Sequence, residues 1–560
     1  MAQPIDAAKK IIGEMLGGSE RRPVVLPQFQ RPYSWERGHI AAFWADLIGF
    51  LDKFRKNPIE ASYFLGPVVI LDDPREVIIL DGQQRLATCT ILLAKLRDAA
   101  RALGGGSQAG ADFARDLQRD LIEKSRIPLA YALTLSDLDE PFFCQTVKAD
   151  PPVIVKPTLR SHLLMQGAAD VFAKNVESMI NGESTSKSID VLRDIQNSVT
   201  KAMTLVAITV KDEEDAFDIF ESLNDRGLRL SVPDLVVNLL LRRCDKKNRQ
   251  TVRQKWNGVV QELGKRDVSR FLRHLWISQY GDLKTRGLYT EIKNHLSEKK
   301  LTSLEFAQTC SDEPEIYVAL IDKAVSMTKQ ARRNLEGLLG YLGVYNSLPL
   351  LLSGQICLTD SDFEKLLKAT VRIYVRHTLL ANENPLELES AFYNAAREIR
   401  AQHTAKRPSK QCLLAAKTIL EKLNPLDSIV EEKARELVLS RSQARWFMVE
   451  IANATQSETK EIGMDKANLE HIFPQNAGAD WPNRKELQPY IWHVGNLTIL
   501  GDRINAKARN KPFKEKFRDH YKKSEIRLTK DLTKLPKTWD AVAIHKRAAD
   551  LAKKIIRIWS

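Results

Sequence analysis

Apolar positions recur with two different periods in the first 105 residues, and this mixture predicts strands as well as helices. Short apolar runs bounded by turn residues indicate buried strands at residues 24–26, 63–71 and 77–80. Apolar residues three and four positions apart predict one helix over residues 36–54 and another over residues 84–103, which ends at consecutive glycines. This end of the chain is therefore expected to combine helices with a sheet.

The rest of the chain shows mainly the helical period. The first sixteen residues read as an amphipathic helix, and residues 111–200 look mainly helical, with a loop at 181–188. A strand is expected at 204–210, and a helical stretch follows it. Beyond it the pattern is almost all helix, with amphipathic segments around residues 250–280, 333–352, 361–381 and 428–454. The last hundred residues change again, to short apolar runs, turns and basic helices.

These patterns predict a mostly helical, multidomain α+β protein. A chain of 560 residues is long enough for two to four domains. The changes of pattern near residues 240 and 455 predict an N-terminal domain over 1–240, a helical domain over 241–455 and a C-terminal domain over 456–560. No fixed-period repeat is found.

Composition narrows the class of protein. Hydrophobic residues make up 43% of the chain and charged residues 28%, which is ordinary for a globular domain and excludes a disordered chain. We expect no signal peptide and, because no run of 18 apolar residues occurs, no membrane span. The six cysteines form no CxxC pair, which argues against a zinc ribbon or a disulfide framework and favours a cytoplasmic location.

Charge points to one class of partner. The formal net charge is +14, and residues 461–560 contain 21 Lys and Arg against 12 Asp and Glu, a net +9. Positive charge gathered in this way is typical of a surface that contacts nucleic-acid phosphates. A solvated basic face explains the charge equally well, so the individual residues of this region must decide between the two.

Four residues of the basic region have the types and the order that a one-metal phosphodiesterase needs. Glu470 and His471 are adjacent, Asn496 follows, and Asn505 comes after it. Glu470 and Asn505 offer the hard oxygen ligands that Mg²⁺ or Mn²⁺ prefers. His471 can take a proton from a water molecule aimed at phosphorus, and the metal ion can stabilise charge on the phosphate.

The local pattern can bring these residues together. Residues 469–473 and 496–500 read as the two strands of a hairpin, and residues 502–511 as the helix that presents Asn505. Neighbouring side chains of a strand face opposite ways, so a strand end or bulge is needed for Glu470 and His471 to approach one phosphate. The alternative is an ordinary strand end with surface asparagines. It is the weaker interpretation, because four residues match in type and in order.

This part of the sequence resembles the His-Me finger (HNH) nuclease motif and, more closely, the C-terminal nuclease domain of GmrSD-type restriction enzymes. The resemblance rests on Glu-His-Ile-x-Pro-Gln, then Gly-Asn-Leu-x-x-Leu, then a second Asn. It implies a ββα-metal fold in which His471 is the general base, Asn496 orients it, and Glu470 and Asn505 bind the metal. It further implies phosphate contacts by Asn510, Lys511 and Lys514. Many HNH proteins have Asp where this chain has Glu470. His493 is expected to be structural rather than a partner of the site.

A second constellation lies in the N-terminal region. A buried strand runs into Asp81-Gly82-Gln83-Gln84-Arg85, and a helix starts at once. Helix N–H groups beside Arg85 make an anion site, and Gly82 permits a tight turn. In the earlier segment 27–35, Arg31 can clamp phosphate, and Tyr33 and Trp35 can stack on a base. Alternatively, Asp81 only caps the helix, Arg85 pairs with it, and both aromatic residues belong to the core.

These segments resemble the ParB/sulfiredoxin-like N-terminal domain of GmrSD-type enzymes, through Gln-Arg-x-Tyr-x-Trp and Asp-Gly-Gln-Gln-Arg. The Phe-Leu-Gly at 64–66 and the Asn-Asp-Arg-Gly at 224–227 match further elements of that domain. The resemblance implies an α/β domain that binds and hydrolyses nucleoside triphosphates and senses modified DNA. The nucleotide site it implies consists of Gln30, Arg31, Tyr33, Trp35, Asp81, Gly82, Gln83, Gln84 and Arg85, with Asn224 and Arg226 as weaker candidates.

The sequence as a whole predicts an NTP-regulated, divalent-metal-dependent endonuclease that cleaves modified foreign DNA, such as phage DNA, as in type IV restriction. Its expected cofactors are Mg²⁺ or Mn²⁺ and a nucleoside triphosphate. Its expected partners are double-stranded DNA and a second copy of the chain in a homodimer, but no membrane. Two alternatives stay open: a nuclease effector that senses phosphorothioate-marked DNA, and a non-enzymatic, NTP-switched DNA-binding regulator.

Overall fold

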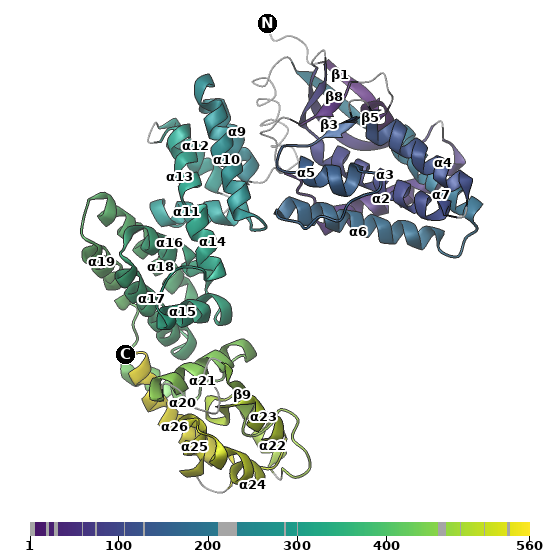
Figure 1. The fold of residues 1–560 in the computed structure, drawn as a ribbon. Coiled ribbons are helices and arrows are strands. Elements are labelled where there is room, and N and C mark those ends of the chain that lie inside the picture. The colour runs from purple at the N-terminus through teal and green to yellow at the C-terminus, as the bar shows by residue number, and fades with distance from the viewer. Residues whose placement is uncertain are drawn as a thin grey trace. The chain divides into compact units, whose positions relative to one another are not determined.

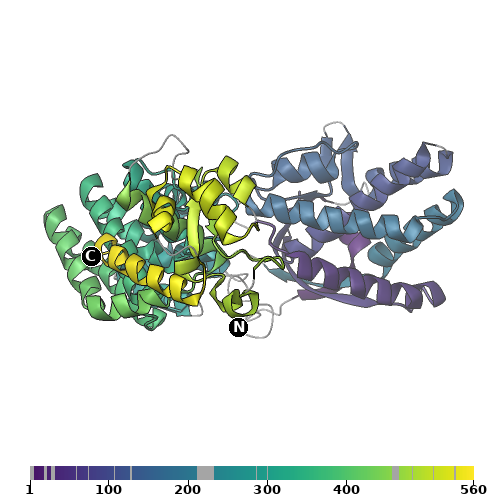
Figure 2. The same cartoon turned by 90° about the horizontal axis from the view of Figure 1, so that it is seen from below.

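The computed structural model describes residues 6–17, 22–26, 32–58, 60–72, 75–105, 107–126, 129–210, 232–284, 287–298, 301–456, 466–481, 483–508, 510–534 and 538–560. The chain forms two compact units, shown as ribbons in Figures 1 and 2. The N-terminal unit comprises Met1–Leu272 and Thr285–Glu315, and the C-terminal unit comprises Arg273–Lys284 and Ile316–Ser560. The predicted domain boundaries near residues 240 and 455 stay predictions.

The N-terminal unit is built on a six-stranded sheet in the order β1-β8-β3-β4-β2-β7. Its strands are β1 (Asp6–Ile11), β2 (Val24–Val25), β3 (Tyr63–Asp72), β4 (Val77–Asp81), β7 (Leu133–Thr134) and β8 (Met203–Val210). β3 pairs parallel with β8 on one side and antiparallel with β4 on the other. The four strands expected from apolar runs are confirmed, and the runs are uninterrupted because β3, β4 and β8 lie inside the sheet.

The expected N-terminal helix is wrong over Asp6–Ile11, and its first five residues lie outside the described part of the chain. The structure has a strand at Asp6–Ile11, and only Ile12–Leu16 is helical (α1). β1 pairs antiparallel with most of β8, from Asp6 opposite Thr209 to Ile11 opposite Thr204. The edge of β8 supplies main-chain hydrogen-bond partners that a helical propensity cannot outweigh. Exposed lysines on β1 suit its position at the edge of the sheet.

Helices cover the sheet and contribute most of the core. They are α2 (Arg37–Lys56), α3 (Gln83–Gly104), α4 (Gln108–Leu117), α5 (Glu140–Phe143), α6 (Arg160–Ile180) and α7 (Thr185–Asn197). α3 is buried on most of its surface, and α6 packs against both α2 and α3 (Figure 1). The region expected to be mainly helical also contains β5 (Glu123–Arg126), β6 (Leu129–Tyr131) and β7, which are too short to show a strand period.

Between residues 232 and 455 the described chain is almost all helix, as expected from about residue 240 to 455. Its helices up to residue 322 are α9 (Val232–Arg243), α10 (Arg249–Leu263), α11 (Val268–Tyr280), α12 (Leu288–Ser297), α13 (Ser303–Asp312) and α14 (Pro314–Asp322). Those that follow are α15 (Lys329–Leu335), α16 (Leu348–Cys357), α17 (Asp360–Tyr374), α18 (Pro385–Thr404), α19 (Ser409–Glu421), α20 (Asp427–Arg435) and α21 (Arg441–Thr455). Within the described ranges, no helix is long and apolar enough to cross a membrane.

The last part of the chain holds the predicted hairpin. β9 (Asn468–His471) pairs antiparallel with β10 (Leu497–Leu500), and α23 (Asp502–Ala508) follows directly. The remaining helices are α22 (Arg484–Leu487), α24 (Phe513–Glu515), α25 (Arg527–Lys530) and α26 (Ala541–Ile558). A separate apolar cluster lies beneath them and includes Phe473, Trp481 and Trp539. The mostly helical, multidomain α+β class is confirmed.

Candidate functional site

The two strands of the C-terminal hairpin place the predicted nuclease residues in a fixed register. His471 is the last residue of β9 and lies opposite Leu497, while Glu470 lies opposite Thr498. Asn496 immediately precedes β10, so it stands beside the end of β9 at which His471 lies. This end of the hairpin is the strand end that Glu470 and His471 were expected to need.

Asn496 is fully buried and fastens the chain just after His471. Its Oδ1 accepts hydrogen bonds from the Phe473 amide at 2.8 Å and the Trp539 indole at 3.0 Å. Its Nδ2 donates to the carbonyls of Phe473 at 3.0 Å and Ile491 at 3.2 Å. Because each side-chain atom makes two bonds, Asn496 fixes the main chain beyond β9. That Asn496 orients His471 stays a prediction, and these bonds are compatible with it.

Glu470 is buried in a network on the other face of β9. Its Oε1 accepts hydrogen bonds from Lys516 Nζ at 2.7 Å and from the Tyr521 hydroxyl at 2.9 Å. Burial raises the pKa of Glu470, and the charge of Lys516 opposes that shift. Both bonds end on Oε1, so a metal ion at Oε2 would not displace them. The carboxylate thus fits the metal-binding role predicted for it, through one oxygen.

The lysine that bonds Glu470 also holds the main chain of the next two residues. It is fully buried, and its Nζ also donates to the carbonyls of His471 at 2.8 Å and Ile472 at 3.2 Å. Lys516 is not among the site residues predicted from the sequence. A signal exists, because Phe513 lies one helical turn before Lys516 and His520 one turn after it, which places the lysine on the buried face.

His471 is half-buried at the end of β9. Its ring meets the ring of Trp492 edge to face at 4.6 Å between centroids, and its Nε2 lies 3.2 Å from the side-chain nitrogen of Gln475. Burial, and secondly the charge of Lys516, lower the pKa of His471 to about 4. The imidazole is therefore neutral at pH 7, which is the form that accepts a proton.

Asn505 lies on the helix that follows the hairpin. It is partly buried in α23, which packs against β9, and the Asn468 amide donates to the Asp502 carboxylate at the start of that helix. The structure therefore places Asn505 on an element in contact with the strand of Glu470 and His471. The three residues predicted to contact phosphate, Asn510, Lys511 and Lys514, are exposed.

The second constellation occupies the turn from β4 into α3. Gly82 has a φ of 99°, and a Cβ there would lie 2.3 Å from Cγ1 of Val68, so this turn needs glycine. α3 begins at Gln83, as expected. Gln83 is buried, and its Oε1 has no hydrogen-bond partner among the residues that the structure describes. Asp81 is partly buried at the end of β4.

The structure brings the two N-terminal motifs together. Gln84 accepts a hydrogen bond from the Ser34 amide at 2.8 Å and donates to the Pro32 carbonyl at 3.3 Å. Tyr33 is buried in the core, and its hydroxyl bonds Thr88 at 2.8 Å. In this position the ring supports α3 and is not exposed for stacking. Trp35 is partly buried and packs on Phe43 and His39.

Arg85 lies where β3 has a bulge. Its Nη1 donates to the Pro67 carbonyl at 3.0 Å. Gly66 has a φ of 123°, and a Cβ there would lie 3.1 Å from the guanidinium, so the glycine makes room for Arg85. The guanidinium therefore stands beside the N-terminal end of α3, as an anion site requires. Gln30, Arg31, Asn224 and Arg226 lie outside the described residues.

Asp139 is a further residue that the sequence analysis missed. It is buried, accepts a hydrogen bond from the Tyr33 amide at 2.6 Å and another from the Ser161 hydroxyl, and its Oδ1 lies 3.9 Å from His162 Nε2. Burial raises its pKa to about 6. Nothing in its neighbourhood of the sequence marks it, because its partners come from distant segments.

Comparison with known families covers both constellations. Residues 12–241 match the N-terminal domain of GmrSD restriction endonucleases, and residues 425–554 match the C-terminal domain of the same enzymes. No curated protein matches the chain. The two matches include the turn from β4 to α3 and the hairpin with α23, in the order of the family, and together cover more than half of the chain. The chain therefore belongs to the GmrSD restriction endonuclease family.

Proposed function

We propose that this protein is a divalent-metal-dependent endonuclease that cleaves modified foreign DNA, as in type IV restriction, and that His471 is its general base. The observation that carries the proposal is the end of the β9–β10 hairpin. There a neutral histidine stands next to a buried glutamate, and Asn496 and Lys516 fix the main chain that follows them. The family supports the endonuclease part, and the net +9 of residues 461–560 supports a DNA surface.

The residues divide the reaction between them. His471 takes a proton from the attacking water molecule. Oε2 of Glu470 and the amide oxygen of Asn505 are the groups that would hold Mg²⁺ or Mn²⁺, which supplies positive charge to the phosphate during cleavage. Asn496 and Lys516 keep His471 in place through its main chain. Asn510, Lys511 and Lys514 bind the flanking phosphates.

We propose further that the N-terminal unit binds a nucleoside triphosphate at the start of α3 and that this binding regulates cutting. The first N–H groups of a helix and a neighbouring guanidinium favour a phosphate there. Arg85 contributes the charge, Gly82 the tight turn into the helix, and Gln83 a buried side chain able to bind a ligand. Gln84 and Tyr33 hold the two motifs in position.

A digest panel tests the nuclease and its substrate. Unmodified, hydroxymethylated, glucosylated and phosphorothioated DNA are each incubated with the protein, with and without Mg²⁺, and with and without each NTP. We expect cutting of a base-modified DNA that requires Mg²⁺. Cutting restricted to phosphorothioated DNA would identify a phosphorothioate-sensing effector instead. Tight DNA binding without any nick under all conditions would identify a regulator.

A variant of Arg85 tests the nucleotide site. Arg85→Ala removes a guanidinium that lies over Gly66, and we expect it to abolish NTP hydrolysis or the effect of NTP on cutting. Arg75→Ala, at a position that is exposed on the same unit, is the matched control. If Arg85→Ala hydrolyses NTP and responds to it like the wild type, the site is misplaced.

A further inference from the structure

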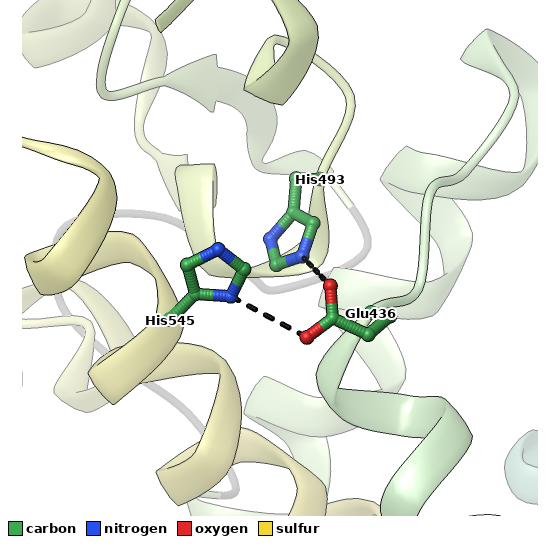
Figure 3. Close-up of side chains that lie close together, drawn as sticks. All are labelled: Glu436, His493 and His545. Carbon is green, nitrogen blue, oxygen red and sulfur yellow. Dashed lines mark ion pairs between the residues drawn. The ribbon is translucent and has the colours of Figure 1, made fainter. Parts of the chain in front are cut away.

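A second group of metal-ligating side chains lies in the C-terminal unit, outside the nuclease residues. Glu436 follows the end of α20, His493 precedes the 3₁₀ turn η11 (Val494–Asn496), and His545 lies on α26. One ligand atom of each falls within 4.8 Å of the others (Figure 3). His493 Nε2 is 3.9 Å and His545 Nδ1 is 3.5 Å from the Glu436 carboxylate. We propose that these three residues form a binding site for a borderline divalent cation of the zinc class.

His493 supplies the first independent observation. Its side chain is only 3% exposed, and among the described residues its Nε2 makes no hydrogen bond of ordinary length, although the ring also interacts with the backbone of Arg435. A buried polar atom of this kind normally has a partner or a bound ion. Nε2 points toward the Glu436 carboxylate at a distance too long for a hydrogen bond (Figure 3). A cation between the two would satisfy both groups.

His545 supplies the second observation. Its Nε2 lies 3.2 Å from the hydroxyl of Tyr490, and its Nδ1 faces Glu436. A histidine that binds a metal usually gives its other ring nitrogen to an oxygen of the protein, which fixes the ring and the protonation state. If Nε2–H donates to Tyr490, Nδ1 carries the lone pair, and this is the nitrogen that faces the proposed site.

The backbone around the cluster is already organised. The amide of Val494 donates to the carbonyl of Leu437 at 2.8 Å, and the amide of Leu439 donates to Trp492 at 3.0 Å. These bonds fasten the residues next to Glu436 to the residues next to His493. Glu436 itself is exposed, so its side chain is free to shift. A small shift would bring its carboxylate to the distance of about 2 Å at which it would bind the ion.

The donor set selects the class of ion. Two imidazole nitrogens and one carboxylate oxygen suit Zn²⁺ and similar transition metals, with a fourth position left for water. Mg²⁺ prefers a shell of oxygen ligands only, so this cluster is expected to bind it poorly. The proposed site and the nuclease residues would thus hold different metals. The inference concerns metal binding and does not rest on the proposed nuclease function.

One hydrogen bond changes when the site is filled. The Gly495 amide donates to Nδ1 of His493 at 3.2 Å, which places the proton of the neutral ring on Nε2. Coordination through Nε2 moves this proton to Nδ1 and ends the bond from Gly495. Gly495 is the neighbour of Asn496, so an occupied site acts on the turn that fixes the main chain after His471.

Zinc titration of the full-length protein tests the proposal. The His471→Ala background is used, in excess Mg²⁺, so that zinc binding at the nuclease residues is suppressed. Zn²⁺ is added to chelator-treated protein and followed by calorimetry, and Co²⁺ is added in parallel to record the visible absorption of a site with nitrogen ligands. We expect one ion per chain and a rise in the melting temperature with Zn²⁺.

Glu436 is exposed and His545 is only partly buried, so variants of these two ligands should fold. Glu436→Gln and His545→Gln are each expected to weaken zinc binding at least about tenfold and to remove the Co²⁺ spectrum. Glu432→Gln on α20 and His403→Gln on α18 remove one exposed carboxylate and one exposed imidazole elsewhere, and they should bind like the parent. Unchanged zinc affinity in Glu436→Gln and His545→Gln, or no saturable zinc binding in the parent, would overturn the proposal.

Discussion

Lys516 is the residue on which the buried charge of Glu470 depends. Its ammonium group is fully buried, bonds Glu470 and holds two carbonyls beside His471. Removing one member of such a pair leaves the other charge uncompensated, which costs about 3–5 kcal/mol. Lys516→Met should therefore lower the melting temperature of the C-terminal unit strongly, as followed by tryptophan fluorescence.

The control is an exposed lysine two residues earlier. Lys514→Met should change stability by less than about 0.5 kcal/mol. Pairing Lys516→Met with Glu470→Gln removes both charges and should restore part of the loss. Equal melting temperatures for Lys516→Met and Lys514→Met would show that the buried pair does not hold the hairpin.

Asp139 predicts a pH dependence of stability in the N-terminal unit. Burial raises its pKa from an ordinary value of 3.8 to about 6 in the folded protein. Between these values the folded state binds a proton that the unfolded state does not, so stability falls as pH rises from about 4 to 6. The loss is of the order of 3 kcal/mol when the titration is complete. Asp139→Asn stays neutral, so thermal unfolding should lose this part of its pH dependence.

The exposed neighbour Asp137 provides the comparison for this measurement. Asp137→Asn should keep the pH dependence of the wild type, because this substitution is at an exposed position and leaves the buried Asp139 in place. The account of Asp139 fails if Asp139→Asn and the wild type lose stability in parallel between pH 4 and 6.

At the scale of single residues, the sequence predicts which side chains could do chemistry better than it predicts which residues they bond. The types and order of Glu470, His471 and Asn496 are visible in the chain itself, because the spacing of a hairpin is local. Lys516 bonds Glu470 across 46 positions, and Asp139 bonds Tyr33 across 106 positions. No local pattern encodes such pairs. Tyr33 is an example. From the sequence, an aromatic residue close to Arg31 could either stack on a base or pack in the core, and only the structure shows that it is buried.

Among the elements, the turn between β4 and α3 depends on Gly82. Gly82→Ala combines a left-handed φ of 99° with a Cβ 2.3 Å from Val68, so β3 or α3 must shift. The expected cost is about 2–4 kcal/mol, from backbone strain and overpacking together. Thermal unfolding of the N-terminal unit and NTP binding should both be impaired.

Gly167 on α6 is the matched control for that substitution. Nothing lies within 4 Å of a Cβ at this position, so Gly167→Ala should leave stability unchanged or raise it by up to about 1 kcal/mol. If Gly82→Ala is as stable as Gly167→Ala, the close contact with β3 is not a constraint.

Helices and strands were predicted correctly where the spacing of apolar residues was regular and did not depend on distant segments. The apolar runs of β3, β4 and β8 and the long amphipathic helices follow from side-chain spacing. β1 was missed because its conformation is set by the free edge of β8, almost two hundred residues later. β5, β6 and β7 are too short to show a period.

For the molecule as a whole, the concentration of positive charge predicts a steep salt dependence of DNA binding. Each phosphate neutralised by a lysine releases counterions, so the slope of log affinity against log salt counts these contacts. Lys511→Ala and Lys514→Ala should each reduce the slope by about one. Lys410→Ala on α19 is an exposed control and should leave it unchanged. A flat salt response of the wild type would exclude the basic region as the DNA surface.

Cleavage by His471→Ala tests the central claim most directly. The variant removes the proposed general base and leaves Glu470, Asn505 and the basic surface in place. The rate of Mg²⁺-dependent DNA cutting should fall by about 10²–10⁴-fold, while DNA affinity and melting temperature stay those of the wild type. His403→Ala, on α18, should cut normally. Cutting by His471→Ala at the wild-type rate would contradict the assignment of this hairpin as the nuclease centre.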